Sequence, residues 1–486
     1  MATTIDRPAL ESNDASESRD DKTRPFSHFY RVIWRWHFYA GLLVIPVVVI
    51  LSITGIIRLF KPQIEQAMYG NLMQVVQSGP ALSYSQQLES AEAAYPDATP
   101  TGFRPSDAAD RAAEVGLKTA DGRDLTAYVD PYTGLVKGDR IDSETVPAIA
   151  EKIHGTLLIG TVGDYIVELV ACWALVLVLT GLYLWFPRKR SAVWGALLPR
   201  LRARGRTLWR DVHALTGFYG SLLVLFMILT GLPWTGFWGN RFSQVWNQYP
   251  SGFFDAPKST VLTGSLNQDG SKIIPWAAEQ LPIPLSSTEA GHEGHGGSTA
   301  SSATAPTARQ AVPLDLDSVI GIAEANGIHS GYNIRLPQDP KGVYTFSLFG
   351  GDLKNEVVMH IDQYSGDVLA NVGWEQFGTI PKVVENGISI HTGERFGVPN
   401  QLLMLATTLG ILVLTVTAPV MWWTRRPAGR LGAPAMPKNF PLWKGAVAIM
   451  IILGVMFPLL GASLLAVLLI DFLVIRRIPV LQRTFV

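Results

Sequence analysis

Long apolar runs are the feature of this sequence that most constrains its fold. A membrane-spanning helix needs roughly 20 mostly apolar residues, and four runs reach that length. The composition agrees, because 48% of the 486 residues are hydrophobic and only 16% are charged. We therefore expect an α-helical integral membrane protein. The four runs lie at about 37–60, 165–186, 210–236 and 400–423.

A fifth apolar stretch, at about 442–475, is too long for one ordinary span. Pro458 and Gly461 interrupt it near its middle, and a proline inside a helix removes a backbone hydrogen bond. We expect two short helices in a C-terminal hairpin here. With the four runs above, this gives six spans.

The orientation of the spans follows from basic residues in short loops, which favour the cytoplasmic side. The loop "PRKRSAVWGALLPRLRARGR" between the second and third runs is rich in arginine and lacks acidic residues. The sequence "WWTRRPAGR" after the fourth run is basic as well. We therefore expect both termini in the cytoplasm, and the long segments 61–153 and 237–390 on the outer side.

The two long outer segments have mixed polarity, with strand-like and helical patterns, so we expect two small α+β domains there. The polar N-terminal tail contains no apolar core of the signal-peptide type. In the first half of the chain we predict a disordered cytoplasmic tail at 1–30, a first span at 31–60, a first outer domain at 61–153, and an outer-face histidine segment with a second span at 154–187. A basic cytoplasmic loop at 188–208 leads to the second half, with a third span at 209–236, a second outer domain at 237–390 that contains a low-complexity insertion at 286–310, and an outer-face histidine segment with a fourth span at 391–424. A cytoplasmic loop at 425–441 and the hairpin with its tail at 442–486 complete the prediction.

The chain also contains an internal duplication. The sequence around the first run aligns without gaps with that around the third, and the second with the fourth. The superposed positions are His37 on His213, Gly41 on Gly217, Thr54-Gly55 on Thr230-Gly231, His154 on His391, Gly160 on Gly397, Thr180 on Thr417, Trp185 on Trp422 and Arg188 on Arg425.

The outer segments share a third match. The sequence "YVDPYTGLVKG" at 128–138 aligns with "HIDQYSGDVLA" at 360–370, and both predict a strand, a tight turn with glycine and a second strand. Each half of the chain is thus a span, an outer domain and a second span. Because both halves begin inside, the repeats are parallel and their symmetry axis is expected along the membrane normal.

The duplication includes four histidines. His37 and His213 lie at the predicted cytoplasmic ends of their spans, and His154 and His391 lie just before spans on the outer side. A twofold axis brings equivalent positions together, which predicts one inner pair and one outer pair. Facing histidines between helices can bind the iron of a haem. A structural role remains an alternative, since duplication copies a structural histidine as well.

Two b-type haems fit this pattern better than bare metal ions, which usually take three or four protein ligands. Glycines follow each histidine and leave room for a flat ring, and the flanking residues are aromatic and aliphatic. The single cysteine, Cys172, excludes internal disulfides and cysteine-based iron–sulfur or zinc sites. No dinucleotide-binding glycine motif or P-loop is present, so an electron donor would be a separate quinol or cytoplasmic flavoprotein reductase. A net charge of zero gives no reason to expect nucleic-acid binding.

The sequence resembles the PepSY-associated transmembrane family of bacterial inner-membrane proteins, from about residue 25 to 425. The resemblance implies outer domains of PepSY type in the periplasm, and haem-iron ligation by the four paired histidines. Some members of this family are haem-containing reductases that deliver electrons to ferric siderophores. The motifs that carry the resemblance to the family are "RWHFYAG" (35–41), the turns at 130–134 and 362–366, "DVHALTGFYG" (211–220), "LTGLPWTGFWG" (229–239) and "SIHTGERFG" (389–397).

We therefore expect a multi-pass inner-membrane oxidoreductase that passes electrons to a periplasmic ferric siderophore or other ferric chelate. No side chain is needed as an acid–base catalyst. Trp234, Trp238 and Trp246 are candidates for docking the chelate, or else form an interfacial aromatic belt. A quinone or copper complex as acceptor is equally compatible with the sequence. The alternative function is a PepSY-type periplasmic binding or regulatory membrane protein without haem.

Overall fold

The computed structural model divides the chain into two compact units. The first comprises Met1–Val49, Leu169–Leu225 and Gly410–Val486, and the second comprises Ile50–Glu168 and Phe226–Leu409. The predicted tail at 1–30 lies largely outside the described residues, as do the insertion at 286–310 beyond Ser287 and most of the loop at 425–441. The structure describes residues 25–187, 194–200, 202–247, 254–267, 272–287, 312–426, 431–432, 444–475 and 477–478.

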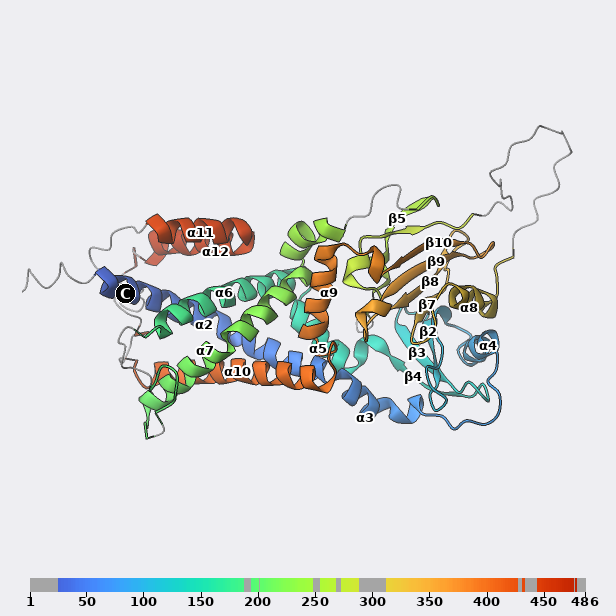
Figure 1. The fold of residues 1–486 in the computed structure, drawn as a ribbon, viewed down its shortest axis with the longest axis horizontal. Coiled ribbons are helices and arrows are strands. Elements are labelled where there is room, and N and C mark those ends of the chain that lie inside the picture. Colours follow the sequence, from blue (N-terminus) through green and yellow to red (C-terminus); the bar gives the residue numbers. More distant parts are fainter. Residues whose placement is uncertain are drawn as a thin grey trace, which may run out of the picture. The chain divides into compact units, whose positions relative to one another are not determined.

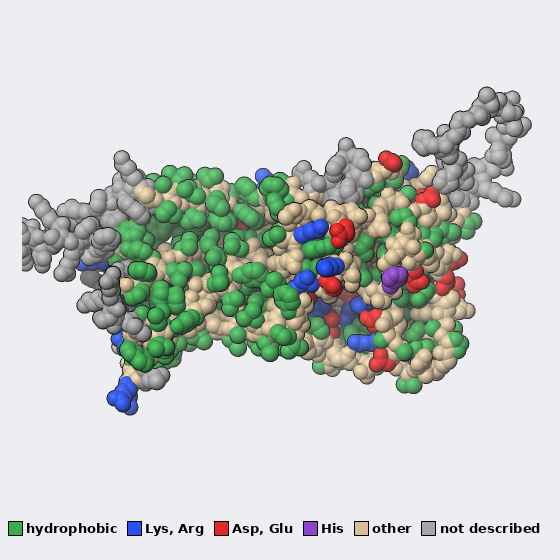
Figure 2. Space-filling view, viewed as in Figure 1, with side chains coloured by type: hydrophobic (Ala, Val, Ile, Leu, Met, Phe, Trp, Pro, Cys, Tyr) green, Lys and Arg blue, Asp and Glu red, His purple; other side chains and the backbone are tan. Residues whose placement is uncertain are grey.

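Four long helices carry the apolar runs, and each is shared between the two units. All four are long and apolar enough to cross a membrane, since even 25 residues extend about 38 Å at 1.5 Å per residue. Hydrophobic side chains cover the visible surface of these helices (Figure 2). The helices are α2 (Pro25–Leu59), α6 (Thr161–Trp185), α7 (Arg206–Gly231) and α10 (Val398–Trp423).

The C-terminal stretch forms two short helices of 13 residues each, α11 (Lys444–Met456) and α12 (Pro458–Ile470). They pack against each other, and the backbones approach so closely that a Cβ on Gly461 would lie 2.7 Å from the carbonyl oxygen of Gly454. The predicted hairpin is confirmed. The two helices of the hairpin are shorter than the four long helices, even though helical structure continues from α12 to Val474, and the prediction of six spans stays a prediction.

The second unit contains one eight-stranded antiparallel sheet, in the order β10-β9-β8-β7-β1-β2-β3-β4. The first outer segment contributes one half of it and the second outer segment the other (Figure 1). The strands are β1 (Thr99–Arg104), β2 (Ala113–Lys118), β3 (Asp124–Val129), β4 (Val136–Ile141), β7 (Asn333–Arg335), β8 (Val343–Leu348), β9 (Val357–Asp362) and β10 (Val368–Gly373), and β5 (Lys258–Leu262) pairs separately with β6 (Pro282–Pro284).

The prediction of two separate outer domains is therefore wrong. The halves join where β1 pairs with β7, with Phe103 opposite Ile334. An isolated half would expose β1 or β7 as a free edge, whose unpaired backbone groups invite further pairing. Joining the two edges satisfies these groups and creates one hydrophobic core, to which both halves contribute.

Helices α4 (Tyr84–Ala94) and α8 (Leu316–Ala325) cover one face of the sheet (Figure 1). Ser83 caps α4 by accepting a hydrogen bond from the amide of Gln86, whose side chain accepts one from the Ser83 amide. The remaining helices of this unit are α3 (Lys61–Met73), α5 (Val146–Thr156) and α9 (Thr379–His391). Short helical turns are η3 (Asp142–Glu144), η4 (Leu232–Trp234), η5 (Gly239–Ser243), η6 (Gln244–Asn247), η7 (Thr263–Leu266), η8 (Trp276–Ala278), η9 (Leu353–Asn355) and η10 (Trp374–Gln376), with η11 (Asp471–Ile475) after α12.

The predicted strand–turn–strand motifs are confirmed at both places. Asp130 accepts a hydrogen bond from the amide of Tyr132 between β3 and β4, and Asp362 accepts the equivalent bond from Tyr364 between β9 and β10. Gly134 and Gly366 have φ angles of 72° and 77° in these turns, a conformation that favours glycine.

Candidate paired-histidine sites

The first unit brings His37 of α2 and His213 of α7 together. Their ring centroids are 6.4 Å apart and the rings are nearly perpendicular, at 89°. An ion pair fixes the start of α7 nearby, because the fully buried Asp211 receives two hydrogen bonds from the guanidinium of the partly exposed Arg200. We call His37 and His213 the α2–α7 pair.

Each ring of the α2–α7 pair is held by a threonine on a neighbouring helix. Nδ1 of His37 lies 2.9 Å from Oγ1 of Thr180 on α6, and Nδ1 of His213 lies 2.8 Å from Oγ1 of Thr417 on α10. Both threonine hydroxyls donate their single proton to a backbone carbonyl in the preceding turn, at 2.6 Å and 2.7 Å. They can therefore only accept from the imidazoles.

The second unit repeats the arrangement with His154, in the last turn of α5, and His391, the last residue of α9. Nδ1 of His154 lies 3.0 Å from Oγ1 of Thr54, and Nδ1 of His391 lies 2.9 Å from Oγ1 of Thr230. These hydroxyls also donate to preceding carbonyls, at 2.8 Å and 2.7 Å. We call His154 and His391 the α5–α9 pair.

The hydrogen bonds define the tautomer of all four histidines. A threonine oxygen whose proton is committed elsewhere accepts from Nδ1–H, so the proton of each neutral imidazole sits on Nδ1 and the lone pair on Nε2. Among the described residues, Nε2 of these histidines has no hydrogen-bond partner. A ring oriented through one nitrogen, with the other nitrogen free, is the usual state of a metal-binding histidine.

Burial keeps the α5–α9 pair neutral. It lowers the pKa of His391 to about 4, with a smaller contribution from the nearby His154. The pKa of His154 is also lowered, chiefly by burial. Lost solvation disfavours the charged imidazolium, so both rings offer a lone pair at neutral pH. After His154, α5 ends at Thr156, and the next two residues, Leu157 and Leu158, have φ angles of 50° and 62°, which are strained for leucine.

Glycines next to three of the threonines let the rings lie against helix backbone. A Cβ on Gly181 would lie 3.2 Å from Cε1 of His37, one on Gly55 would lie 3.4 Å from Cε1 of His154, and one on Gly231 would lie 3.5 Å from Cε1 of His391. Only the fourth threonine, Thr417, is followed by alanine.

Of the glycines that follow the histidines in sequence, which were expected to leave room for a flat ring, three face leucine side chains and three face open space; these are Gly41, Gly217 and Gly393, and Gly155, Gly160 and Gly397. A Cβ on Gly41 or Gly217 would meet the side chains of Leu177 or Leu414 at ordinary distances, and Gly155 faces open space. The close approaches to the imidazoles come instead from the Thr-Gly pairs across the helix interface.

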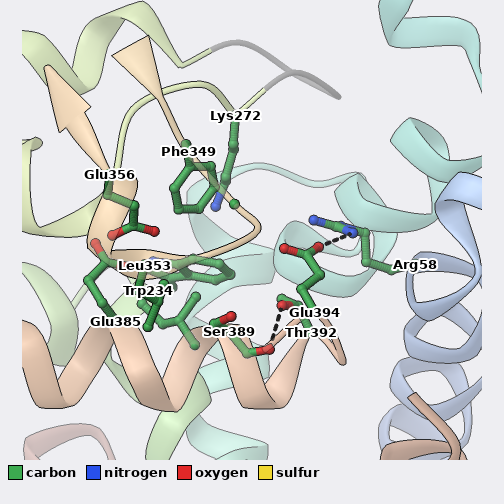
Figure 3. Close-up of a pocket in the computed structure, with 12 residues that line it drawn as sticks. Arg58, Trp234, Lys272, Phe349, Leu353, Glu356, Glu385, Ser389, Thr392 and Glu394 are labelled. Atoms are coloured by element: carbon green, nitrogen blue, oxygen red, sulfur yellow. Dashed lines mark hydrogen bonds and ion pairs between the residues drawn. The ribbon is translucent and has the colours of Figure 1, made fainter. Parts of the chain in front are cut away.

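The second unit contains a pocket that is lined in part by residues close to His391 in the sequence (Figure 3). Ser389 and Thr392, which are neighbours of His391 on and after α9, line it. The other lining residues include Arg58, Trp234, Lys272, Phe349, Gly350, Leu353, Glu356, Glu385, Ile388 and Glu394.

The three candidate docking tryptophans have different surroundings. Trp234 lines the pocket, and the ammonium of Lys272 lies 3.9 Å from its ring centroid. The amide of Trp238 donates to the buried carboxylate of Glu168 at 2.9 Å, so this residue helps to anchor the chain after α7. Trp246 is 58% exposed. Neither Trp238 nor Trp246 is among the residues that line the pocket.

A family model described as the PepSY-associated TM region matches residues 34–425, which include all four paired histidines. The chain belongs to the PepSY-associated transmembrane family. The resemblance seen in the sequence is thereby confirmed. A search of curated proteins finds no match.

In this PepSY-associated transmembrane protein, the threonine partners are the site residues that sequence reasoning missed. Thr54 aligns with Thr230 and Thr180 with Thr417 in the internal duplication, so the signal was present. A polar residue duplicated together with a histidine inside an apolar helix is a candidate hydrogen-bond partner, because polar groups within a membrane require partners.

Proposed function

We propose that the protein passes electrons across the bacterial inner membrane, from the cytoplasmic side to a periplasmic ferric siderophore or other ferric chelate, and that each histidine pair holds one b-type haem. Reduction releases the iron, because chelates that hold ferric iron tightly hold ferrous iron weakly. The observation that carries the proposal is the pairing of imidazoles whose Nδ1 is engaged by a threonine and whose Nε2 is free.

The α2–α7 pair fits one haem iron between its two rings. Two metal–nitrogen bonds of about 2 Å each, with about 1 Å from each nitrogen to its ring centre, give a centroid separation of roughly 6 Å. The observed separation of 6.4 Å matches this value. A hydrogen bond on Nδ1 of each ring would orient His37 and His213 toward the bound group and raise their basicity.

Haem suits these sites better than a bare ion. The parts of the chain that the structure describes hold no group of three or more histidine, cysteine, aspartate or glutamate side chains arranged for a metal ion. Two protein ligands are too few for a typical zinc or copper site, but they complete the coordination of a haem iron. The bound haem would supply one-electron redox chemistry, while the protein supplies orientation, insulation from water and tuning of the potential.

The proposed direction rests on charge. Arg200, Arg202 and Arg204 precede α7, which begins at Arg206 and carries His213 in its first turns, and Arg425 and Arg426 follow α10. Basic residues at these ends favour the cytoplasm, and this supports the proposal that the α2–α7 pair lies near the inner face and the sheet in the periplasm. Electrons would then enter from a quinol or from a cytoplasmic flavoprotein reductase.

The experiment is an optical spectrum of the detergent-purified protein, oxidised and reduced, with haem quantified per chain. We expect a low-spin b-type spectrum with two haems per chain. His213→Ala and His391→Ala should each remove a different haem, and the control His329→Ala, in an exposed loop of the second unit, should remove neither. A colourless protein from haem-sufficient cells would overturn the proposal and favour a PepSY-type binding or regulatory protein.

A further inference from the structure

Helices α5 and α9, which carry His154 and His391 near their C-terminal ends, each expose an apolar stripe. The stripe residues recur at spacings of three, four or seven, which place side chains on one face of an α-helix. Val383 is 67% exposed, the most of all of them. The stripes consist of Val146, Ile149 and Ile153 on α5 and of Ile380, Val383 and Ile390 on α9.

The opposite sides of both helices are packed against the rest of the second unit. Ala148 and Ala150 of α5 are buried, and so are Ile388 and Ser389 of α9. This packing fixes the rotation of each helix about its own axis. The stripes therefore face outward and cannot turn inward without exposing what is now buried.

Both halves of the chain have the stripe at equivalent positions. The alignment of His154 with His391 superposes Val146 on Val383 and Ile153 on Ile390. Single exposed apolar residues are common in proteins and need no explanation. Two equivalent stripes, each leading to a histidine of the same pair, indicate a shared apolar partner.

Each stripe continues into the surface of a long helix. Only four residues separate α5 from α6, and six separate α9 from α10. Exposed apolar side chains occupy these connections and the first turns that follow them. They are Ile159, Val162 and Tyr165 on the way into α6, and Phe396, Val398 and Leu402 on the way into α10.

The direction of α9 suits a position along a membrane surface. This helix runs across the direction of the first turns of α10, which belong to the same unit (Figure 1). A helix that lies across the direction of a span, with an apolar face and a packed polar side, is typical of the membrane interface. Exposed Phe242 and Trp246 follow α7 in the same unit, and aromatic side chains are enriched at this level.

We propose that α5 and α9 are interfacial helices whose apolar stripes are covered by lipid acyl chains, and that this contact sets the depth of His154 and His391 in the membrane. The occupant is the bilayer rather than a second protein, because the stripes are continuous with helix surfaces that lipid covers once α6 and α10 cross a membrane. The inference is independent of any cofactor at the histidines.

The test places a spin label on the full chain in nanodiscs of phosphatidylcholine and phosphatidylglycerol. Val146→Cys and Val383→Cys carry the label on the two stripes. Leu222→Cys, at an exposed position within α7, is the lipid reference, and Leu135→Cys, exposed between β3 and β4, is the water reference. The native Cys172 is buried, so the wild type measures background labelling.

Collisions of the label with oxygen, which concentrates in acyl chains, are compared with those of a polar nickel chelate, which stays in water. We expect the oxygen-to-nickel ratio of both stripe positions to match that of Leu222→Cys. A ratio like that of Leu135→Cys would overturn the proposal, because the stripes would face water. Few collisions with either reagent would overturn it as well, because a protein surface would then cover them.

A second measurement tests whether lipid contact sets the depth. The label is placed at Phe396→Cys, five residues after His391. Replacing Ile380 and Val383 together by serine should shift its collision ratio toward that of the water reference, and the control Leu135→Ser should leave it unchanged. An unchanged ratio in the stripe variant would refute the proposed control of depth.

Discussion

The hydroxyl of Thr230 accepts a hydrogen bond from Nδ1 of His391 at 2.9 Å and donates its own proton to the carbonyl of Phe226 at 2.7 Å. Because the hydroxyl has only one proton, this geometry assigns the imidazole proton to Nδ1 and leaves Nε2 as a free base. The same chain of two hydrogen bonds recurs at the other three histidines. The threonines thus prepare the rings for a ligand.

Replacing Thr230 by valine should weaken the cofactor site at the α5–α9 pair. Valine keeps the shape but cannot accept from Nδ1–H, so the ring loses its orientation and some basicity. Loss of such a partner typically reduces metal affinity 10- to 100-fold. Haem titration of the apo protein, followed optically, measures the change, and Thr230→Ser should restore affinity.

The control for this variant is Thr407→Val, because Thr407 is a buried threonine of α10 that bonds only its own helix, at 2.8 Å. The Thr407→Val variant should bind both haems as the wild type does. The α2–α7 site should also be unaffected by Thr230→Val. Equal affinity of Thr230→Val and wild type would show that the threonine does not support the ligand.

The pairing of the histidines could be predicted from the sequence, whereas the details of their support could not. Duplicated positions meet under a twofold axis, which led to His37 with His213 and His154 with His391. The bond from His37 to Thr180 joins two helices whose rotation and depth are set by packing. A single sequence does not specify these quantities, so the threonine had no assigned role.

A larger side chain at Gly181 should disturb the α2–α7 pair selectively. Even a Cβ would lie 3.2 Å from Cε1 of His37, closer than an ordinary contact, so valine must push the ring away from its hydrogen bond. We expect Gly181→Val to lose one haem of two. Gly220→Ala on α7, where nothing lies within 4 Å of a Cβ, is the control and should keep both. Full haem content in Gly181→Val would contradict the proposed position of the site.

The strands of the outer segments could be anticipated from alternation and glycine turns, but the single sheet could not. The junction depends on pairing between Phe103 and Ile334, which lie far apart in the sequence. Either edge could have remained free or been covered by a helix. The choice depends on how the two halves are brought together, which local patterns do not encode.

Truncating Ile334 should destabilise the whole sheet rather than one half. Ile334 is 1% exposed in the core shared by both halves, and removal of a buried isoleucine side chain to alanine typically costs about 2–5 kcal/mol. Denaturant unfolding of Ile334→Ala, followed by fluorescence, should show one transition at lower denaturant. Leu135→Ala, at a 64% exposed turn position, should leave the midpoint unchanged. Two separate transitions would indicate independent halves.

Two buried carboxyl groups of the second unit, Glu356 and Glu385, also make a prediction about stability. The pKa values of Glu356 and Glu385 are raised by burial, to about 9 and about 7, from an ordinary value near 4.5. Between pH 4.5 and these values the folded state holds more protons than the unfolded state. Stability from this source is therefore fully present at low pH and is lost as the pH rises through the folded-state values. His154 and His391, whose pKa values are lowered, act with the opposite sign below about pH 6.5.

Replacing Glu356 by glutamine removes its proton linkage. We expect the wild type to lose stability between pH 7 and pH 9 with a slope of up to about 1.4 kcal/mol per pH unit for each proton released, and Glu356→Gln to lose markedly less. Urea unfolding at several pH values in one detergent measures both slopes. The exposed Glu375→Gln should follow the wild-type slope. The histidines are present in both proteins, so their contribution cancels when the two slopes are compared. Parallel curves of stability against pH for wild type and Glu356→Gln would mean that Glu356 is already ionised at neutral pH.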